Sequence, residues 1–331
     1  MKKLMVALTL FCVAAVQAFC LPSLYKRELF KVNDIQNFDF DLSWENLVIQ
    51  ECDESKNILI EIYCKKPKYA PTVKKTGSTI VVKSNQDNHF SVFGSNNCTV
   101  IARIPEGAKF EKFFMGTTSG SIRSQVEIEA NIVSSNSTSG SQSITEDLIS
   151  ENASFYSTSG SVFLENFYGQ TLKVSATSGS INVHNFSGKS CSLKATSGSV
   201  TLEGSVSDSF DISTTSGSIG LELNDAPRKN SSAGCTSGSI FIGLPGDADF
   251  SLDVETTSGS FVNALTRTKI DSHVEFKGDI NNGGAVISLS TTSGSVSIDS
   301  TNGKRAKATQ YTSDSDSDSD VPVVSFDDPI F

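Results

Sequence analysis

The chain of 331 residues carries 27 Lys and Arg against 37 Asp and Glu, a formal net charge of −10. A surface of this sign repels phosphate, which argues against nucleic acid and anionic membranes as partners. The three histidines, His89, His184 and His273, do not share a position in the repeat described below, so neither a histidine metal site nor a triad base is expected.

Residues 1–18, MKKLMVALTLFCVAAVQA, predict a signal peptide, with two lysines, a short apolar run and small residues before a cut after Ala18. Its removal changes the charge to −12, from 25 basic and 37 acidic residues. No later run reaches ~18 uninterrupted apolar residues, so no membrane span is expected after cleavage. We therefore expect an exported protein, secreted or held at the cell-envelope surface. A lipid anchor at Cys20 is a less favoured alternative, because bulky Phe19 precedes it.

The tetrapeptide Thr-Ser-Gly-Ser recurs along the chain, with steps of 20, 20, 19, 19, 19, 21, 21 and 35 residues between its glycines. These glycines are Gly120, Gly140, Gly160, Gly179, Gly198, Gly217, Gly238, Gly259 and Gly294. A period near twenty is typical of a solenoid. The corner threonines would then form a ladder along it.

Apolar and polar residues alternate on both sides of each corner, as in Cys191, Leu193 and Ala195 before it and Val200 and Leu202 after it. Such alternation buries one face of a strand. Each repeat is therefore a strand, a corner, a strand and a variable return. The expected fold is all-β: a single-domain parallel β-helix or β-solenoid with coils of about 19–21 residues. We expect glycine at the corner for its positive φ or sharp bend, with Ser and Thr hydroxyls bonding the turning backbone.

The predicted domain organisation has four parts. After the signal peptide come a lead-in at 19–35 and the solenoid at 36–300, divided into degenerate capping coils at 36–110 and Thr-Ser-Gly-Ser repeats at 111–300. The last interval between corner glycines, 35 residues from Gly259 to Gly294, predicts a terminal coil with an insertion. Residues 301–331, with four Ser-Asp pairs, predict a disordered acidic tail.

The cysteines show no metal-type spacing. Cys52, Cys64 and Cys98 lie in successive strand-like segments, so a disulfide among them would staple the cap, but the sequence does not select the pair. Cys191 and Cys235 occupy inward positions, where a small buried residue is expected.

With these features, the chain resembles the bacterial putative-adhesin family, which consists of exported β-helical domains of unknown function with short strands around Thr-Ser-Gly-Ser corners. The resemblance rests on the stretches ENLVIQECDESKNILIEI, VIARIPEGAKFEKFFMGTTSGSI and FKGDINNGGAVISLSTTSGSVSI together with the repeats, which cover most of 36–300. It implies a parallel β-helix on the cell envelope with adhesion as its function, and it offers no catalytic residues to carry over.

Parallel β-helices also occur in polysaccharide lyases and hydrolases, which cluster acidic or basic residues in one outward groove. Outward positions of the repeats here include Arg123, Ser143, Asn182, Thr201 and Ser297, with no aligned acidic cluster. We therefore expect no catalytic residues, no metal, no cofactor and no enzyme activity.

The function expected from the sequence is a cell-surface adhesin or binding scaffold for an unidentified glycan or protein. Outward aromatic residues at Tyr156, Phe163 and Tyr168 are candidates for a binding patch, because such rings stack on sugars or fill a partner's pocket. Two alternatives stay open: an envelope-stress or envelope-assembly interaction module, and a polysaccharide-active β-helix enzyme.

Overall fold

The computed structural model describes residues 23–54, 56–85 and 98–310. The predicted signal peptide, Cys20, His89 and residues 311–331 of the predicted tail lie outside these described residues. The described helices are two three-residue 3-10 turns, η1 (Val32–Asp34) and η2 (Pro67–Tyr69). No described helix therefore has the length and apolar character needed to cross a membrane.

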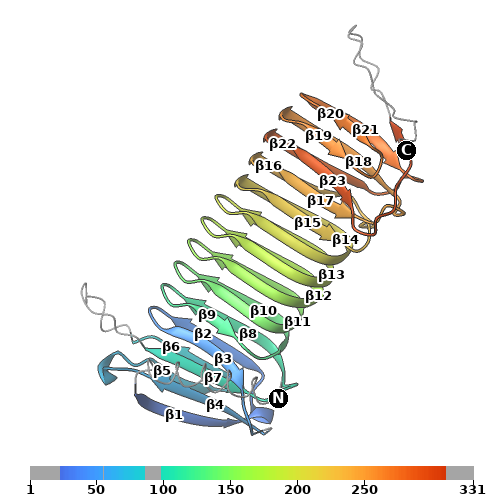
Figure 1. Cartoon of the computed structure of the whole chain (residues 1–331). Helices are drawn as coiled ribbons and strands as arrows, with labels where there is room; N and C mark the ends of the chain where they lie inside the picture. The colour runs from blue at the N-terminus through green and yellow to red at the C-terminus, as the bar shows by residue number, and fades with distance from the viewer. Residues whose placement is uncertain (1–22, 55, 86–97, 311–331) are drawn as a thin grey trace, which may run out of the picture.

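Strands make up the rest of the regular structure and form one rod-shaped solenoid (Figure 1). In chain order they are β1 (Leu24–Lys31), β2 (Asn37–Leu42), β3 (Asn46–Glu51), β4 (Asn57–Tyr63), β5 (Thr72–Thr76), β6 (Thr79–Lys83), β7 (Thr99–Ile104), β8 (Lys109–Thr117), β9 (Ile122–Ser124), β10 (Ile128–Ser137), β11 (Gln142–Ser157), β12 (Val162–Ala176), β13 (Ile181–Ala195), β14 (Val200–Ser216), β15 (Ile219–Leu223), β16 (Ser231–Ser237), β17 (Ile240–Leu244), β18 (Phe250–Ser258), β19 (Phe261–Asn263), β20 (Thr268–Ile270), β21 (Val274–Ile280), β22 (Val286–Ser293), β23 (Val296–Ser300) and β24 (Ala308–Gln310). The predicted all-β parallel solenoid is confirmed.

The coil length follows from the register of the parallel pairs. Val162 of β12 lies beside Ile181 of β13, 19 residues later, and Ile219 of β15 lies beside Ile240 of β17, 21 residues later. Every second residue is buried, as in the B-i-B pattern at the start of β12, because period-2 side chains alternate between the core and solvent. The central coils therefore have the predicted length and the predicted buried face.

Two stacks of strands flank the corners. The pre-corner stack runs β5-β6-β2-β8-β10-β11-β12-β13-β14-β16-β22-β18-β21-β24. The post-corner stack runs β1-β4-β7-β3-β9-β11-β12-β13-β14-β15-β17-β23-β19-β20. The longest strands pass from one stack to the other around the coil.

The order of the coils in space differs from their order in the sequence at both ends. Strands β22 and β23 lie between the coil of β16 and β17 and the coil of β18 and β19 (Figure 1). The repeat at Gly294 is thus an inserted coil, and the prediction of a terminal coil was wrong. Near the other end, β2 and β3 lie between the strands β6 and β7 and the strands β8 and β9. A parallel ladder accepts any strand with a matching pattern, so sequence order does not determine stacking order.

Antiparallel strands close both ends of the rod. At the N-terminal end β1 pairs with β4, and β5 pairs with β6; at the C-terminal end β20 pairs with β19, and β24 pairs with β21. The lead-in at 19–35 thus contributes a strand at 24–31. Residues 301–310, predicted to belong to a disordered tail, instead lead from β23 to β24, which pairs with β21. Backbone pairing with β21 orders this segment despite its polar composition.

The core is one continuous column of apolar side chains. Near the N-terminal end Phe38 packs against Phe110 and Phe113 with ring centroids 4.9 and 4.6 Å apart. In the middle Phe167 and Phe186 of successive coils stack at 5.2 Å. Identical positions in successive coils thus place like side chains in contact.

Candidate binding surface

The corner glycines form a column in which each backbone touches the next, buried at the first five copies and half-buried at the last four. A Cβ atom placed on any of the nine would lie 1.7–2.3 Å from the backbone carbonyl oxygen of the neighbouring corner. Only Gly238 and Gly294 have a positive φ, of 153° and 154°. Of the two reasons expected for glycine, a positive φ or a sharp bend, the positive φ was therefore wrong for most copies. Glycine is required because the stacked corners approach too closely for any side chain.

Thr and the first Ser of each copy lie at the surface, where Thr158 is half-buried and the others are exposed. Their backbone N–H groups donate to carbonyls of the preceding coil, as Thr177 N does to Ser157 O at 3.0 Å and Ser178 N does to Thr158 O at 2.8 Å. Their hydroxyls make no hydrogen bond to another described residue, so the expectation that Ser and Thr hydroxyls bond the turning backbone was wrong for these two positions of the motif. We call this array of exposed hydroxyls the hydroxyl edge. It comprises Thr118 and Ser119, Thr138 and Ser139, Thr158 and Ser159, Thr177 and Ser178, Thr196 and Ser197, Thr215 and Ser216, Thr236 and Ser237, Thr292 and Ser293, and Thr257 and Ser258.

The second Ser of the motif has a structural role. Its Oγ accepts the N–H of the equivalent Ser in the next coil, as in Ser161 with Ser180 at 3.2 Å and Ser295 with Ser260 at 3.3 Å. In several copies, a small polar residue three positions before the glycine bonds the glycine backbone: Ser157 Oγ accepts from Gly160 N at 2.9 Å. The motif thus divides into two exposed hydroxyls, one packing residue and one ladder residue.

The hydroxyl edge ends beside a corner that lacks the motif, Ser43-Trp44-Glu45-Asn46. The Glu45 backbone occupies the glycine position next to Gly120, and its buried carboxylate accepts from the backbone N–H groups of Ser43 and Trp44, both at 3.0 Å. Ser84 Oγ donates to the same oxygen at 2.5 Å. These bonds hold Trp44, a residue that is 65% exposed, at the end of the edge. The sequence did not indicate Trp44, because its corner carries no Thr-Ser-Gly-Ser signal.

The three aromatic residues predicted as a patch occupy three different side-chain ladders. Tyr156, 48% exposed, lies beside Asn136 and Ser175 in the pre-corner stack. Phe163 is half-buried in the post-corner stack, with its ring 5.6 Å from that of His184. Tyr156 and Phe163 therefore flank the same corner, that of Gly160.

Tyr168, 41% exposed, lies five residues beyond Phe163, beside Ile149 and Ser187. No ring contact among the described residues joins it to Tyr156 or Phe163. The structure thus brings two of the three predicted residues to one corner and leaves the third farther along the coil.

Acidic residues gather at the opposite bend of the coils, where the sequence showed no aligned cluster. Glu203 lies beside Glu222, and its Oε2 is 3.2 Å from His184 Nδ1. Burial raises the pKa of Glu127, and the nearby negative charge of Asp147 raises it further. The alignment depends on the register of return segments that vary in sequence, so spacing alone did not reveal it. In the described part of the chain, no three acidic, histidine or cysteine side chains are grouped to hold a metal ion.

A buried carboxylate stabilises the N-terminal cap. Glu61 of β4 accepts hydrogen bonds from Arg27 Nη2 at 2.6 Å, Arg103 Nε at 3.1 Å and Tyr63 Oη at 3.3 Å. Burial raises the pKa of Glu61, but the hydrogen bonds and positive charge of the two arginines outweigh it, so that the pKa lies below its ordinary value. Glu61 thus joins β1, β4 and β7, which is a structural role.

The cap also contains the Cys64–Cys98 disulfide, with a Cα–Cα distance of 4.3 Å. Cys52 is free and buried, as are Cys191 and Cys235 at their predicted inward positions. Burial raises the pKa of the Cys191 thiol to about 12. Such a thiol is protonated at neutral pH and is a packing residue.

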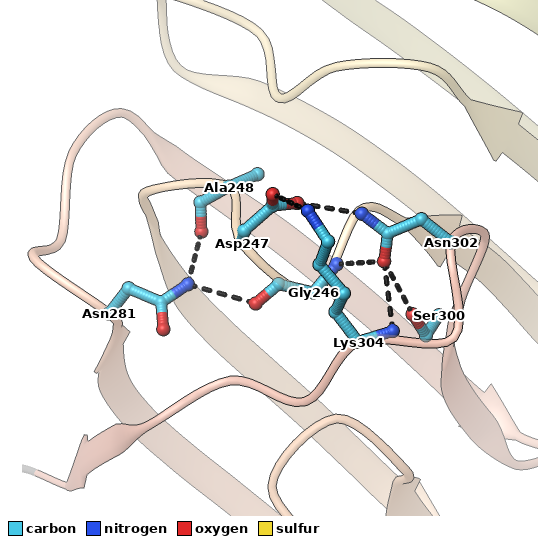
Figure 2. A network of polar contacts seen from close by, with 7 residues as sticks. All are labelled: Gly246, Asp247, Ala248, Asn281, Ser300, Asn302 and Lys304. Atoms are coloured by element: carbon cyan, nitrogen blue, oxygen red, sulfur yellow. Dashed lines mark hydrogen bonds and ion pairs between the residues drawn. The ribbon is translucent and has the colours of Figure 1, made fainter.

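Figure 2 shows a polar network that ties three loops together at the C-terminal end. Asn302 Oδ1 accepts from Gly246 N at 3.1 Å, and its Nδ2 donates to Asp247 at 2.7 Å. Asn281 Nδ2 donates to the carbonyls of Gly246 and Ala248 at 3.1 and 2.7 Å. The network satisfies backbone groups where the inserted coil interrupts the sequence order, which is a structural role.

These features together are a regular rod, a column of close-packed glycines and an exposed edge of hydroxyls. The family model described as Toastrack DUF4097 matches residues 35–299. The chain belongs to the Toastrack DUF4097 family. No functionally curated protein shows significant similarity to this Toastrack chain.

Solved structures resemble the Toastrack chain at low sequence identity. One is described as a "putative adhesin from Parabacteroides distasonis ATCC 8503", with 10% identity, a TM-score of 0.51, and coverage of 84% of this chain and 97% of that chain. Another, a "putative adhesin from Parabacteroides merdae ATCC 43184", has 11% identity, a TM-score of 0.49, and coverage of 82% and 95%. At such identity the first likeness supports the fold alone.

Proposed function

We propose that this protein is an exported, non-catalytic scaffold that binds a glycan at the cell surface and that the hydroxyl edge is its contact surface. The observation that carries the proposal is the set of exposed Thr and Ser hydroxyls, because the fold itself does not use them. The names of the similar structures agree with adhesion.

The spacing of the edge suits an extended, repeating ligand. Neighbouring parallel strands lie ~4.8 Å apart, so nine stacked corners present pairs of hydroxyls over about 38 Å. Because the corner backbones are hydrogen-bonded to both neighbouring coils, binding would order little additional chain, which favours affinity.

Aromatic rings beside the edge support a glycan ligand. Tyr156 and Phe163 flank the corner of Gly160, and Trp44 lies at one end of the array. Sugar rings present apolar faces together with hydroxyl groups, so stacking on aromatic rings beside hydrogen-bonding hydroxyls matches their chemistry. Tyr168 is proposed as a weaker, outlying contact.

The test is binding of residues 19–331 to an array of glycans and extracellular-matrix proteins, with and without three lysines on the edge. Thr158→Lys, Thr177→Lys and Thr196→Lys together should abolish saturable glycan binding, because they block three successive corners. The control carries Ser134→Lys, Ser154→Lys and Ser192→Lys, which add the same charge to an outward ladder of the pre-corner stack.

Each result separates the candidate functions. Binding lost in the edge variant and retained in the control supports the proposal. Equal binding by both variants refutes the edge as the contact surface. Saturable binding only to protein from its own envelope favours an assembly module, and turnover of a polysaccharide favours an enzyme.

A further inference from the structure

The two ends of the rod differ and lie far apart. β24, the last described strand, closes the pre-corner stack at one end, and β5 closes the same stack at the other (Figure 1). The stack contains 14 strands, so at ~4.8 Å per step its 13 steps separate these edges by about 62 Å. The chain continues beyond β24 for 21 residues, 311–331.

Exposed lysines gather at the β5 end. Residues 62–85 contain six lysines and no acidic residue. We call the exposed lysines just before η2, in η2 and in β5 the basic end: Lys65, Lys66, Lys68, Lys74 and Lys75. Lys75 Nζ lies 3.4 Å from Asp34 Oδ2, whereas Lys65, Lys66 and Lys74 form no ion pair with another described residue. Among the described residues, this end therefore carries more positive than negative charge, on a protein that is acidic overall.

β5 also presents a strand edge. It pairs with β6 on one side, and no described strand pairs with it on the other. Unpaired strand edges accept an extended segment through backbone hydrogen bonds, with side-chain contacts adding specificity. The basic end thus offers both charge and a backbone edge.

The segment beyond β24 has complementary chemistry. Residues 311–331 contain six aspartates and neither Lys nor Arg, and Ser and Asp alternate from Ser313 to Asp320. In an extended chain this alternation puts all four aspartates of the run on one side.

The aspartates cannot reach the basic end of their own molecule. Asp320 is ten residues beyond Gln310, and ten residues span at most about 36 Å when fully extended. That is little more than half of the separation between β24 and β5. Even Asp328, 18 residues beyond Gln310, would need an almost completely extended chain of about 65 Å. Only the basic end of a second molecule is within easy reach.

We propose that the Ser-Asp segment of one molecule binds the basic end of another, so that the rods associate head to tail. The contact joins two different surfaces and leaves one of each unoccupied, and such heterologous contacts produce open chains rather than closed dimers. The proposal does not depend on the ligand of the hydroxyl edge.

Sedimentation velocity of residues 19–331 over a range of protein concentrations tests the proposal. At about 0.1 M salt the weight-average mass should rise with concentration to at least twice the monomer mass. At about 1 M salt it should return toward the monomer, because the Debye length falls from about 10 Å to about 3 Å. A chain that stays monomeric at both salt concentrations overturns the proposal.

Two variants locate the contact. The tailless chain ends at Gln310, and the lysine variant carries Lys65→Gln, Lys66→Gln, Lys68→Gln and Lys74→Gln. Each alone should remain a monomer. Their equimolar mixture should form a dimer and nothing larger, because it contains one intact segment and one intact basic end per pair. Absence of that dimer, or association of the tailless chain by itself, refutes head-to-tail binding.

Matched controls separate this contact from general charge effects and from misfolding. Lys173→Gln, Lys194→Gln, Lys269→Gln and Lys277→Gln remove the same charge from exposed sites elsewhere on the rod and should leave association unchanged. Replacing the four aspartates of the Ser313–Asp320 run by asparagine leaves the described solenoid untouched and should abolish association. Association that persists in the asparagine variant contradicts the proposal.

Discussion

The close contact between corner glycines makes a single methyl group a severe perturbation. In Gly179→Ala the new Cβ would lie 2.0 Å from the carbonyl oxygen of Gly160 and 2.8 Å from the backbone nitrogen of Ser161. Contacts below about 3.0 Å essentially do not occur, so the two corners must separate by about 1 Å. Both atoms belong to backbone, so no side chain can move aside instead.

The loss of stability expected for Gly179→Ala follows from the hydrogen bonds that this shift breaks. Thr177 N and Ser178 N donate to the preceding coil at 3.0 and 2.8 Å, and both bonds would be lost. Two hydrogen bonds contribute about 2 kcal/mol together. Overpacking in a tight interior adds about 1–3 kcal/mol. The expected loss of stability is therefore about 3–5 kcal/mol, or a fall in Tm of about 10 °C for a chain of this size.

Gly220→Ala is the matched control. Gly220 lies in β15 without a positive φ, and a Cβ there would meet nothing within 4 Å. Its substitution should leave the Tm unchanged or raise it slightly, because alanine reduces the entropy of the unfolded chain. Circular dichroism melts of the parent and both variants give the comparison. A Gly179→Ala variant as stable as Gly220→Ala would refute the close-approach explanation of the motif.

Three further predictions concern the core and the cap. Phe167→Ala should destabilise the fold by about 3–5 kcal/mol because its ring is fully buried, whereas Tyr168→Ala, next to it but exposed, should change stability by about 0.5 kcal/mol or less in urea titrations. Because folding lowers the pKa of Glu61, its carboxylate stabilises the protein above the ordinary pKa of about 4.3, and this contribution is lost as pH falls through the lower folded value. Between about pH 5 and pH 3, the Tm of the Glu61→Gln variant should therefore fall by less than the Tm of the parent. Parallel plots of Tm against pH for the two proteins would contradict this role. Replacing Cys64 and Cys98 by serine opens a loop of 34 residues and should cost about 3–4 kcal/mol in the same titrations, and unchanged stability would exclude the disulfide as a staple.

Much of the fold could be predicted because its information is local. The twenty-residue period and the alternation around each corner specify strand, corner and buried face within a single repeat, as for Leu193 and Val200. The same alternation predicted that Cys191 and Cys235 point inward, and both are buried as predicted. These features depend on which way a side chain points, which a two-residue period determines.

The candidate surface was only partly predictable. The alternation of inward and outward positions identified Tyr156 and Phe163 as outward residues. Their position on two sides of one corner, however, depends on how the coil bends. Trp44 was missed because its corner has no repeat signal, and Glu45 takes the glycine position there only through contact with Gly120.

The sequence by itself determined the repeating unit, its buried face and its exposed hydroxyls. Only the tertiary structure decided the order of the coils, the pairing of Cys64 with Cys98 and the joining of Glu61 to Arg27 and Arg103. The physical reason is that a parallel ladder is satisfied by any strand with the right alternation, so similar repeats compete for the same places. Contacts between residues far apart in the chain, together with the close approach of the corner backbones, select one stacking order among them.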